Sequence, residues 1–227
     1  MMNPTTRMTA LLGAMRRERN GAVADAMRPV GTPYGLNYGV SLPTLRMLAR
    51  AETPDYDFAK YLALQDVREL RLAAYHIADP ARLTEAEYPF WGEGIVNSEL
   101  AEEAAFTLLH RVPDFPNLFE RWTAPDMPWS LQYAALMAAS RLAEPDPAWI
   151  GRALETLHRA AERAESADAV CSKEQALLIA RGAVALLVRI ASGHEENRQV
   201  VLRAVGSVGD LHAENYLREE LSWQLEI

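Results

Sequence analysis

Apolar residues recur every three or four positions along most of this chain, which is the spacing of amphipathic helices. No segment shows the sustained alternation of apolar and polar residues expected of a half-buried strand. Proline, glycine and helix-capping residues divide the pattern into about a dozen helices with short connections. Beyond a first helix after residues 4–6 and one capped by Ser41, the predicted helices span residues 21–28, 58–64, 67–78, 85–96, 99–112, 117–122, 128–143, 147–165, 172–190, 195–205 and 211–224. The fold class is therefore predicted to be all-α.

Three pairs of adjacent alanines recur about 30 residues apart, a period typical of helical repeats. The pairs are Ala73-Ala74, Ala104-Ala105 and Ala134-Ala135, and a comparable pair, Gly182-Ala183, follows 48 residues after Ala134. Small residues at a fixed place let neighbouring helices approach closely. Asp66-Val67-Arg68 resembles the Asp-Val-Arg start of HEAT repeats. We therefore expect a HEAT-like α-solenoid, a curved right-handed superhelix of antiparallel helix pairs, that forms a single domain over residues 1–227.

Alignment of the alanine pairs places polar residues of successive repeats in common columns. The two columns are Arg71, Glu102 and Gln132, and Arg68, Glu99 and Trp129. Residues at one place in a repeat project from corresponding positions of successive helices. We expect the first column to line one surface, separate from the alanine column that packs between helices.

The charge distribution limits the choice of partners. A formal net charge of −8 argues against a protein that binds nucleic acid with its whole surface. The sign is uneven, however, because residues 1–50 hold seven arginines and two acids, whereas residues 84–126 hold nine acids and two arginines. A locally basic face could therefore still meet phosphate groups, and arginine suits bidentate contacts with them.

Several kinds of site are disfavoured by the sequence. A single cysteine, Cys171, provides neither a disulfide framework nor a cysteine-built zinc site, and it is expected to be a small packing residue. The five histidines show no pair at helical metal-ligand spacing. The glycine-rich stretch at residues 31–40 lacks the spacing of a nucleotide-binding loop, so we expect no nucleotide cofactor, and indeed no cofactor at all. From the cysteine and histidine positions we expect no metal. With no apolar span and no signal segment, we expect a cytoplasmic protein without membrane contact.

An acidic run at the start of one predicted helix is the strongest candidate for chemistry. Glu99 and Glu102 are three residues apart and share a helix face, and Glu103 lies nearby. Two carboxylates in a groove could stabilise a cationic transition state or activate water. The alternative is a solvated helix face, where acids near the helix start are favourable. Trp129 likewise is either an aromatic wall on which bases stack or a packing residue.

One stretch resembles a known family. Residues 37–46, NYGVSLPTLR, resemble the Gly-Val-x-x-Pro-x-Leu-Arg motif of the AlkD-like DNA alkylation repair proteins, and residues 67–73 are similar to the repeat that follows it. The resemblance covers residues 20–190. It implies a HEAT-like solenoid that binds duplex DNA in its concave face. The active members of that family are DNA glycosylases that remove positively charged N3- or N7-alkylated purines.

The family's functional positions are only partly kept in this sequence. Its catalytic aspartate falls at Glu102, and its nearby tryptophan falls at Ser98. An arginine that engages DNA falls at Gln132, and a later tryptophan falls near Ala185. Glu102 retains a carboxylate, which could stabilise the sugar as a cationic base departs. The aromatic contacts to such a base have no replacement in Ser98 and Ala185.

Two hypotheses follow. In the first, the chain binds alkylated duplex DNA and acts as a glycosylase. Its catalytic residues are Glu102 and Glu99, and its DNA-binding residues are Arg46, Arg68, Arg71, Trp129 and Gln132. In the second, the chain is a non-catalytic HEAT module that binds a protein partner or an unusual nucleic-acid structure.

Overall fold

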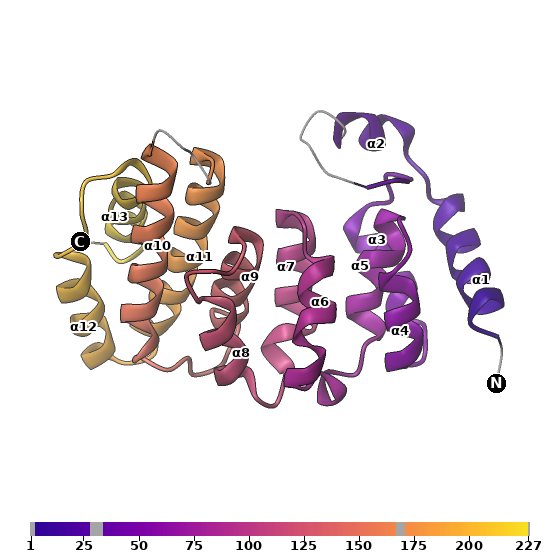
Figure 1. Ribbon diagram of the computed structural model, residues 1–227, viewed down its shortest axis with the longest axis horizontal. Coiled ribbons are helices and arrows are strands. Elements are labelled where there is room, and N and C mark those ends of the chain that lie inside the picture. Colours follow the sequence, from indigo (N-terminus) through magenta and orange to yellow (C-terminus); the bar gives the residue numbers. More distant parts are fainter. Residues whose placement is uncertain (1–2, 28–33, 167–170, 227) are drawn as a thin grey trace. The chain divides into compact units, whose positions relative to one another are not determined.

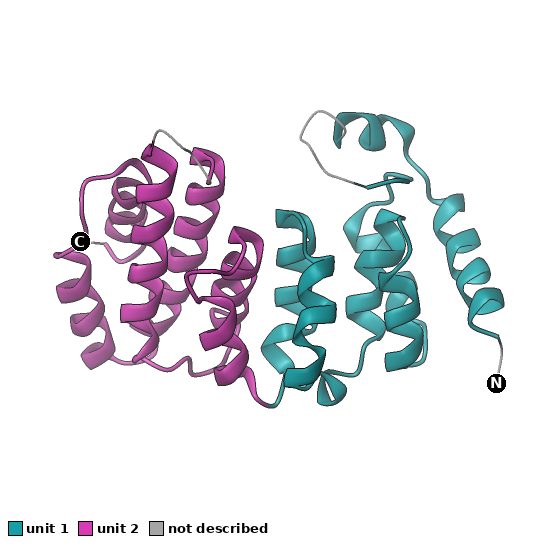
Figure 2. Cartoon of the chain, in the orientation of Figure 1, with its two compact units in different colours: residues 1–113 teal, residues 114–227 magenta. Residues whose placement is uncertain are grey.

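The computed structural model describes residues 3–27, 34–166 and 171–226, and all regular elements in these residues are helices. An isolated parallel bridge joins Leu36 to Val67. The chain divides into two compact units, unit 1 (Met1–Pro113) and unit 2 (Asp114–Ile227), which Figure 2 distinguishes by colour. The prediction of an all-helical, HEAT-like chain is confirmed.

Unit 1 is built around three helices that pack in succession. Helix α5 contacts α3 on one side and α7 on the other, and α4 packs along α5 (Figure 1). The α-helices of unit 1 are α1 (Pro4–Arg17), α2 (Gly21–Met27), α3 (Leu42–Arg50), α4 (Tyr56–Ala63), α5 (Arg68–Ile77), α6 (Tyr88–Gly94) and α7 (Ser98–Thr107). Its short 3-10 helices are η2 (Pro80–Arg82), η3 (Glu85–Glu87) and η4 (Leu109–Arg111).

Unit 2 repeats this arrangement with longer helices. Helix α11 contacts α9 and α13, while α8 packs on α9 and α10 packs on α11. The helices of unit 2 are α8 (Phe115–Trp122), α9 (Trp129–Ala139), α10 (Trp149–Glu165), α11 (Lys173–Ala191), α12 (Glu195–Val205) and α13 (His212–Gln224).

The alanine pairs lie where these helices pack most closely. All six alanines of the pairs on α5, α7 and α9 are 0% exposed. Gly182 on α11 shows how little room there is, because a Cβ at this position would lie 2.9 Å from the Leu136 Cβ on α9. The small-residue column therefore sets the spacing between successive helices, as the sequence predicts.

Side-chain caps define several helix starts. The side chains of Ser41 and Ser172 accept hydrogen bonds from backbone N–H groups of α3 and α11, and Ser172 forms a full capping box with Gln175. Asn97 caps α7 in the same way, by accepting from Leu100 N at 2.9 Å. Each of these side chains satisfies a backbone donor that the helix itself leaves unpaired.

Several predicted helix boundaries are wrong. Thr84 makes no side-chain cap, and the predicted helix over 85–96 is a 3-10 turn followed by α6. Pro89 explains the break, because it has no N–H to donate back to Glu85 and its ring would clash with that carbonyl. The helix predicted over 99–112 ends at Thr107, and the one over 128–143 ends at Ala139. Arg28, the predicted end of the second helix, lies outside the described residues.

Candidate functional site

A buried carboxylate holds the loop that precedes α3, here called the 34–40 loop, against the start of α5. Tyr38 N and Val40 N donate to Glu69 Oε1 at 3.1 and 3.3 Å, and Glu69 is 0% exposed. Gly39 has a φ of +68°, and a Cβ there would lie 2.1 Å from the Asn20 carbonyl oxygen. Only glycine fits this left-handed, crowded backbone. The glycine of the Gly-Val motif is therefore required for the loop to adopt this conformation.

Arg68 and Glu99 form a buried ion pair between α5 and α7. The Arg68 guanidinium donates to both Glu99 carboxylate oxygens, with Nε 2.8 Å from Oε2. Arg68 Nη1 also donates to the Val40 carbonyl at 3.0 Å and contacts Glu69 Oε1 at 3.2 Å. The Tyr34 hydroxyl donates to Glu99 Oε2 at 2.9 Å. This cluster ties the 34–40 loop to two successive repeats.

Burial decides what this pair can do. The Arg68 side chain is 3% exposed and the Glu99 side chain is 18% exposed. Burial and the neighbouring Glu99 carboxylate raise the pKa of Tyr34, so its hydroxyl stays protonated and continues to donate. The placement of Arg68 does not fit the predicted phosphate contact. Both oxygens of Glu99 are already engaged, which does not fit the predicted catalytic assistance either.

A second buried carboxylate, Glu103 on α7, joins three successive helices. Arg46 on α3 donates to it from Nε at 2.9 Å and from Nη2 at 2.6 Å, and His76 Nε2 on α5 lies 2.6 Å from Oε1. Burial on its own would raise the pKa of Glu103, but the hydrogen bonds from Arg46 and His76 outweigh it and lower the pKa to about 2. The Arg46 side chain is 35% exposed, so it reaches solvent while it remains committed to Glu103.

Two other predicted residues of unit 1 are partly exposed. Glu102 on α7 is half-buried, with its position one residue before the enclosed Glu103. Arg71 on α5 is 21% exposed and donates to the Gln65 carbonyl at 2.9 Å and to Asp66 Oδ1 at 3.2 Å. These bonds fix Arg71 at the turn between α4 and α5.

The predicted residues Trp129 and Gln132 belong to unit 2. Gln132 is 4% exposed, and its Nε2 donates to the Ala124 carbonyl at 3.0 Å. Trp129 is half-buried, and both residues line a cleft of about 310 Å³ together with Arg163 and Cys171. Burial raises the pKa of the Cys171 thiol, which disfavours the reactive thiolate. Gln132 thus has a clear structural role as a cap for the α8–α9 connection.

Three arginines at the end of α1 form the most accessible cationic patch of unit 1. We call Arg16, Arg17 and Arg19 the arginine surface; all three are exposed, and none forms an ion pair within the described part of the chain. The patch adjoins the 34–40 loop, because Asn20 N donates to the Tyr38 carbonyl at 2.8 Å and the Arg16 guanidinium lies 5.7 Å from the Tyr38 ring centroid. Unpaired arginines of this kind can bind phosphate oxygens bidentately.

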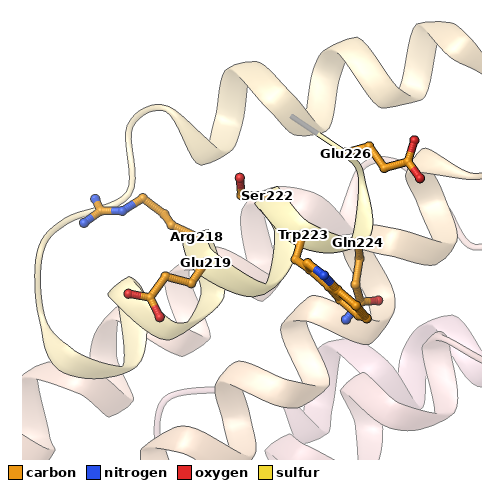
Figure 3. Close-up of a pocket in the computed structure, with 6 residues that line it drawn as sticks. All are labelled: Arg218, Glu219, Ser222, Trp223, Gln224 and Glu226. Atoms are coloured by element: carbon orange, nitrogen blue, oxygen red, sulfur yellow. The ribbon is translucent and has the colours of Figure 1, made fainter.

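A wide cleft of about 1080 Å³ lies along α13, but its side chains do not form a convergent site. Figure 3 shows Arg218 and Glu219 pointing away from Trp223, with Glu226 beyond the end of the helix. Arg218 is already bonded to Asp210 at 2.6 Å, whereas Trp223 is 80% exposed. With two carboxylates and a neutralised arginine, this surface repels phosphate groups.

No group of three or more His, Cys, Asp or Glu side chains among the described residues is arranged to hold a metal ion. No described helix is both long enough and apolar enough to cross a membrane.

The comparisons with known proteins agree with this architecture. The family model described as "DNA alkylation repair enzyme" matches residues 11–173, so the chain belongs to that family. The match includes the 34–40 loop, both buried ion-pair clusters, the arginine surface and the start of unit 2.

A solved structure is similar over nearly the whole chain. It represents "a new family of proteins related to the HEAT-like repeat DNA glycosylases with affinity for branched DNA structures". The two chains are 16% identical, with 98% of this chain and 95% of that chain covered and a TM-score of 0.69. At that identity the similarity establishes the fold. No curated protein matches this sequence.

The sequence reasoning did not find several residues that organise the site. Tyr34, Glu69 and His76 complete the two buried clusters, yet each looks unremarkable in the linear sequence. The alignment of the repeats did hold a signal for the first cluster. Arg68 and Glu99 occupy the same aligned column, and they are bonded to each other in the structure. A column that holds opposite charges in successive repeats can therefore indicate an ion pair between helices.

Proposed function

We propose that this chain binds DNA through unit 1, with the arginine surface holding the phosphate backbone. The observation that carries the proposal is the exposed group Arg16, Arg17 and Arg19, free of ion pairs with described residues in a chain of net charge −8. Membership of a DNA alkylation repair family supports DNA as the polyanion. Arginines outside internal ion pairs can make phosphate contacts without first breaking the fold.

The preferred DNA is proposed to be branched. The structurally similar protein is described as having affinity for branched DNA structures, and this chain has the same fold over almost its full length. Several positions expected to contact an alkylated duplex, by contrast, hold residues engaged inside the protein, namely Arg68, Glu99 and Gln132. A branch point offers closely spaced phosphates from several strands, which suits a compact cationic patch.

Fluorescence anisotropy with a labelled four-way junction and a linear duplex of the same length tests this function. We expect a lower Kd for the junction, and a Kd for both DNAs that rises steeply with salt. Equal affinity for the two DNAs would remove the preference for branches. Undetectable binding to either DNA at low salt would remove DNA binding altogether and favour a protein partner.

Base excision is a second candidate function, carried by the half-buried Glu102 on α7. A carboxylate near the sugar stabilises positive charge that develops as a cationic alkylated purine departs. The test is release of methylated purine from defined duplex DNA by the wild type and by Glu102→Gln. Activity that is lost in Glu102→Gln supports this role, whereas equal activity excludes Glu102 from the mechanism. A wild type that releases no base would leave the chain with the binding function alone.

A further inference from the structure

Unit 1 contains a cavity of about 270 Å³ that none of the functions above uses. It lies between the end of α4, the middle of α5 and the end of α6. Its volume suits one planar ring system, because pockets for drug-sized ligands run from about 300 to 1,000 Å³. All of its lining residues are described and belong to this unit.

The inner wall of the cavity is aromatic. Tyr75, Phe90 and Trp91 line it, with ring centroids of Trp91 at 5.9 Å from Tyr75 and at 5.4 Å from Phe90. Two large apolar side chains stand at its rim in contact with water, since Leu64 is 70% exposed and Val96 is 42% exposed. Aromatic walls and an apolar rim favour a flat, weakly hydrated ligand.

The Tyr75 hydroxyl is the polar group that points to a ligand. Tyr75 is 4% exposed and lines the cavity, yet no hydrogen bond joins its hydroxyl to another residue in the described part of the chain. The hydroxyl oxygen itself is not fully enclosed, so it reaches the open space of the cavity, where a ligand can bond to it. Burial raises the pKa of Tyr75, against a smaller opposing effect of the Arg71 cation. The hydroxyl therefore keeps its proton and can both donate and accept.

The charged residues around the cavity favour an uncharged ring that carries hydrogen-bond donors and acceptors. Arg71 and Glu93 both line it, so a cation and a carboxylate face the same space. Arg71 uses Nε and Nη2 for bonds to the α4–α5 turn, which leaves Nη1 available to an acceptor on a ligand. A phosphate would be repelled by Glu93, whereas adenine, guanine and cytosine each have an acceptor for Arg71 and an exocyclic amino group for Glu93.

The cavity is also connected to the arginine surface through the 34–40 loop. Leu36 N donates to the Asp66 carbonyl at 2.9 Å, and Gly35 N donates to Asp66 Oδ1 at 3.0 Å. The same carboxylate oxygen accepts from Arg71, which lines the cavity. The other end of the loop contacts the end of α1 beside Arg16. A strand held by the arginines and lying along this loop would thus approach the cavity.

We propose that this cavity binds an unpaired nucleobase of DNA, stacked against the aromatic wall and hydrogen-bonded to Tyr75 and Arg71. The inference rests on the proposed DNA-binding function and names the group recognised at a branch or bulge. An unpaired base is already out of the stack, so its capture avoids most of the cost of unstacking. Stacking on an aromatic side chain stabilises each bound base substantially.

The test compares two duplexes that differ by one base. Both carry a single extra nucleotide in one strand; in the first it holds adenine, and in the second it is an abasic sugar. The phosphates are identical, so a difference in Kd reports contacts to the base. We expect the wild type to bind the adenine bulge roughly tenfold more tightly.

Two glycines provide a matched pair of variants. Gly94 lines the cavity, and Gly151 lies on the exposed face of α10; a Cβ at either position meets nothing within 4 Å. Gly94→Leu should fill the mouth of the cavity and abolish the preference for the adenine bulge, whereas Gly151→Leu should preserve it. Tyr75→Phe, which removes only the hydroxyl, should reduce the preference without abolishing it.

The outcomes separate this inference from the function on which it rests. A wild type that binds both bulges with equal affinity overturns the base-binding cavity but leaves DNA binding intact, and the cavity would then suit an apolar side chain of a protein partner. A preference that survives in Gly94→Leu overturns it as well. A wild type that binds neither DNA at low salt overturns the DNA-binding function and the cavity proposal together.

Discussion

The two units use the same helix arrangement but hold their helices together differently. In unit 1, ion pairs that each contain a buried side chain connect the helices, namely Arg68 with Glu99 between α5 and α7 and Arg46 with Glu103 between α3 and α7. In unit 2, apolar and aromatic contacts also connect the helices, as where Gly182 packs on Tyr133 and where the rings of Phe119 and Trp149 stack at 4.5 Å.

The aligned columns make this difference specific. Glu99 of unit 1 corresponds to Trp129 of unit 2, and Glu103 corresponds to Tyr133. A helical repeat fixes where a side chain projects but not its chemistry. In unit 1 the carboxylates of Glu99 and Glu103 therefore bind internal arginines, and the exposed arginines at the end of α1 lie outside the aligned columns.

The largest predicted effect comes from removing the arginine shared by the carboxylates of unit 1. Arg68→Met should lower the free energy of unfolding by roughly 3–5 kcal/mol, because it leaves Glu69 and Glu99 without their buried partner. Urea denaturation measures this change. The matched control is Arg152→Met in unit 2, which breaks an exposed pair with Glu120 and should cost less than about 1 kcal/mol. Equal losses of unfolding free energy in the two variants would mean that the buried cluster stabilises the fold no more than an exposed ion pair does.

A smaller effect is expected at Glu103, and it depends on pH. The pKa of Glu103 is lowered from 4.5 to about 2, so its ionised form stabilises the fold above the unfolded pKa. Glu103→Gln should therefore cost roughly 2–3 kcal/mol at pH 7. That advantage of the wild type should shrink as the pH falls from 4.5 towards 2. Urea denaturation of the wild type and of Glu103→Gln at pH 7 and pH 3 measures this change. A difference in unfolding free energy that is the same at both pH values would contradict the role of the ionised carboxylate.

The smallest predicted effect tests the close packing in unit 2. Gly182→Ala places a Cβ 2.9 Å from the Leu136 Cβ, and it should destabilise the protein by about 1 kcal/mol even though alanine favours helix. At Gly151 the same substitution meets no neighbouring atom and should stabilise by up to about 1 kcal/mol. Thermal denaturation of the two variants should thus show shifts of opposite sign. Two upward shifts would show that the α9–α11 contact can relax at little cost.

The sequence predicted the fold well because the fold depends on repeated local signals. The alanine pairs, the Ser41 and Ser172 caps and the 3.6-residue periodicity all act over one or two turns of helix. The break in the helix predicted over residues 85–96 was missed, although Pro89 lies inside that range and interrupts a helix that the apolar pattern would extend.

The candidate site was predicted less well, because its residues are defined by long-range contacts. Arg68, Glu99 and Arg46 were identified as reactive or DNA-binding residues, yet their bonds to one another, to Glu103 and to the 34–40 loop connect residues 28 to 57 positions apart. Exposure and pairing decide whether a charge is available to a ligand, and neither is visible in a column of aligned residues. The catalytic roles predicted for two glutamates and the DNA-binding roles predicted for five other residues remain predictions, namely those of Glu99, Glu102, Arg46, Arg68, Arg71, Trp129 and Gln132.

The central claim is that the cations of unit 1 make the DNA contacts, and the salt dependence of binding tests it most directly. The measurement is the slope of log Kd against log salt for a four-way junction, in the double variants Arg17→Ala/Arg19→Ala of unit 1 and Arg181→Ala/Arg203→Ala of unit 2. All four arginines are exposed, so the two variants lose the same charge from the surface. The unit 1 variant should flatten the slope by about 2, while the unit 2 variant should leave it unchanged. A slope that flattens equally in both variants, or only in the unit 2 variant, would contradict the claim.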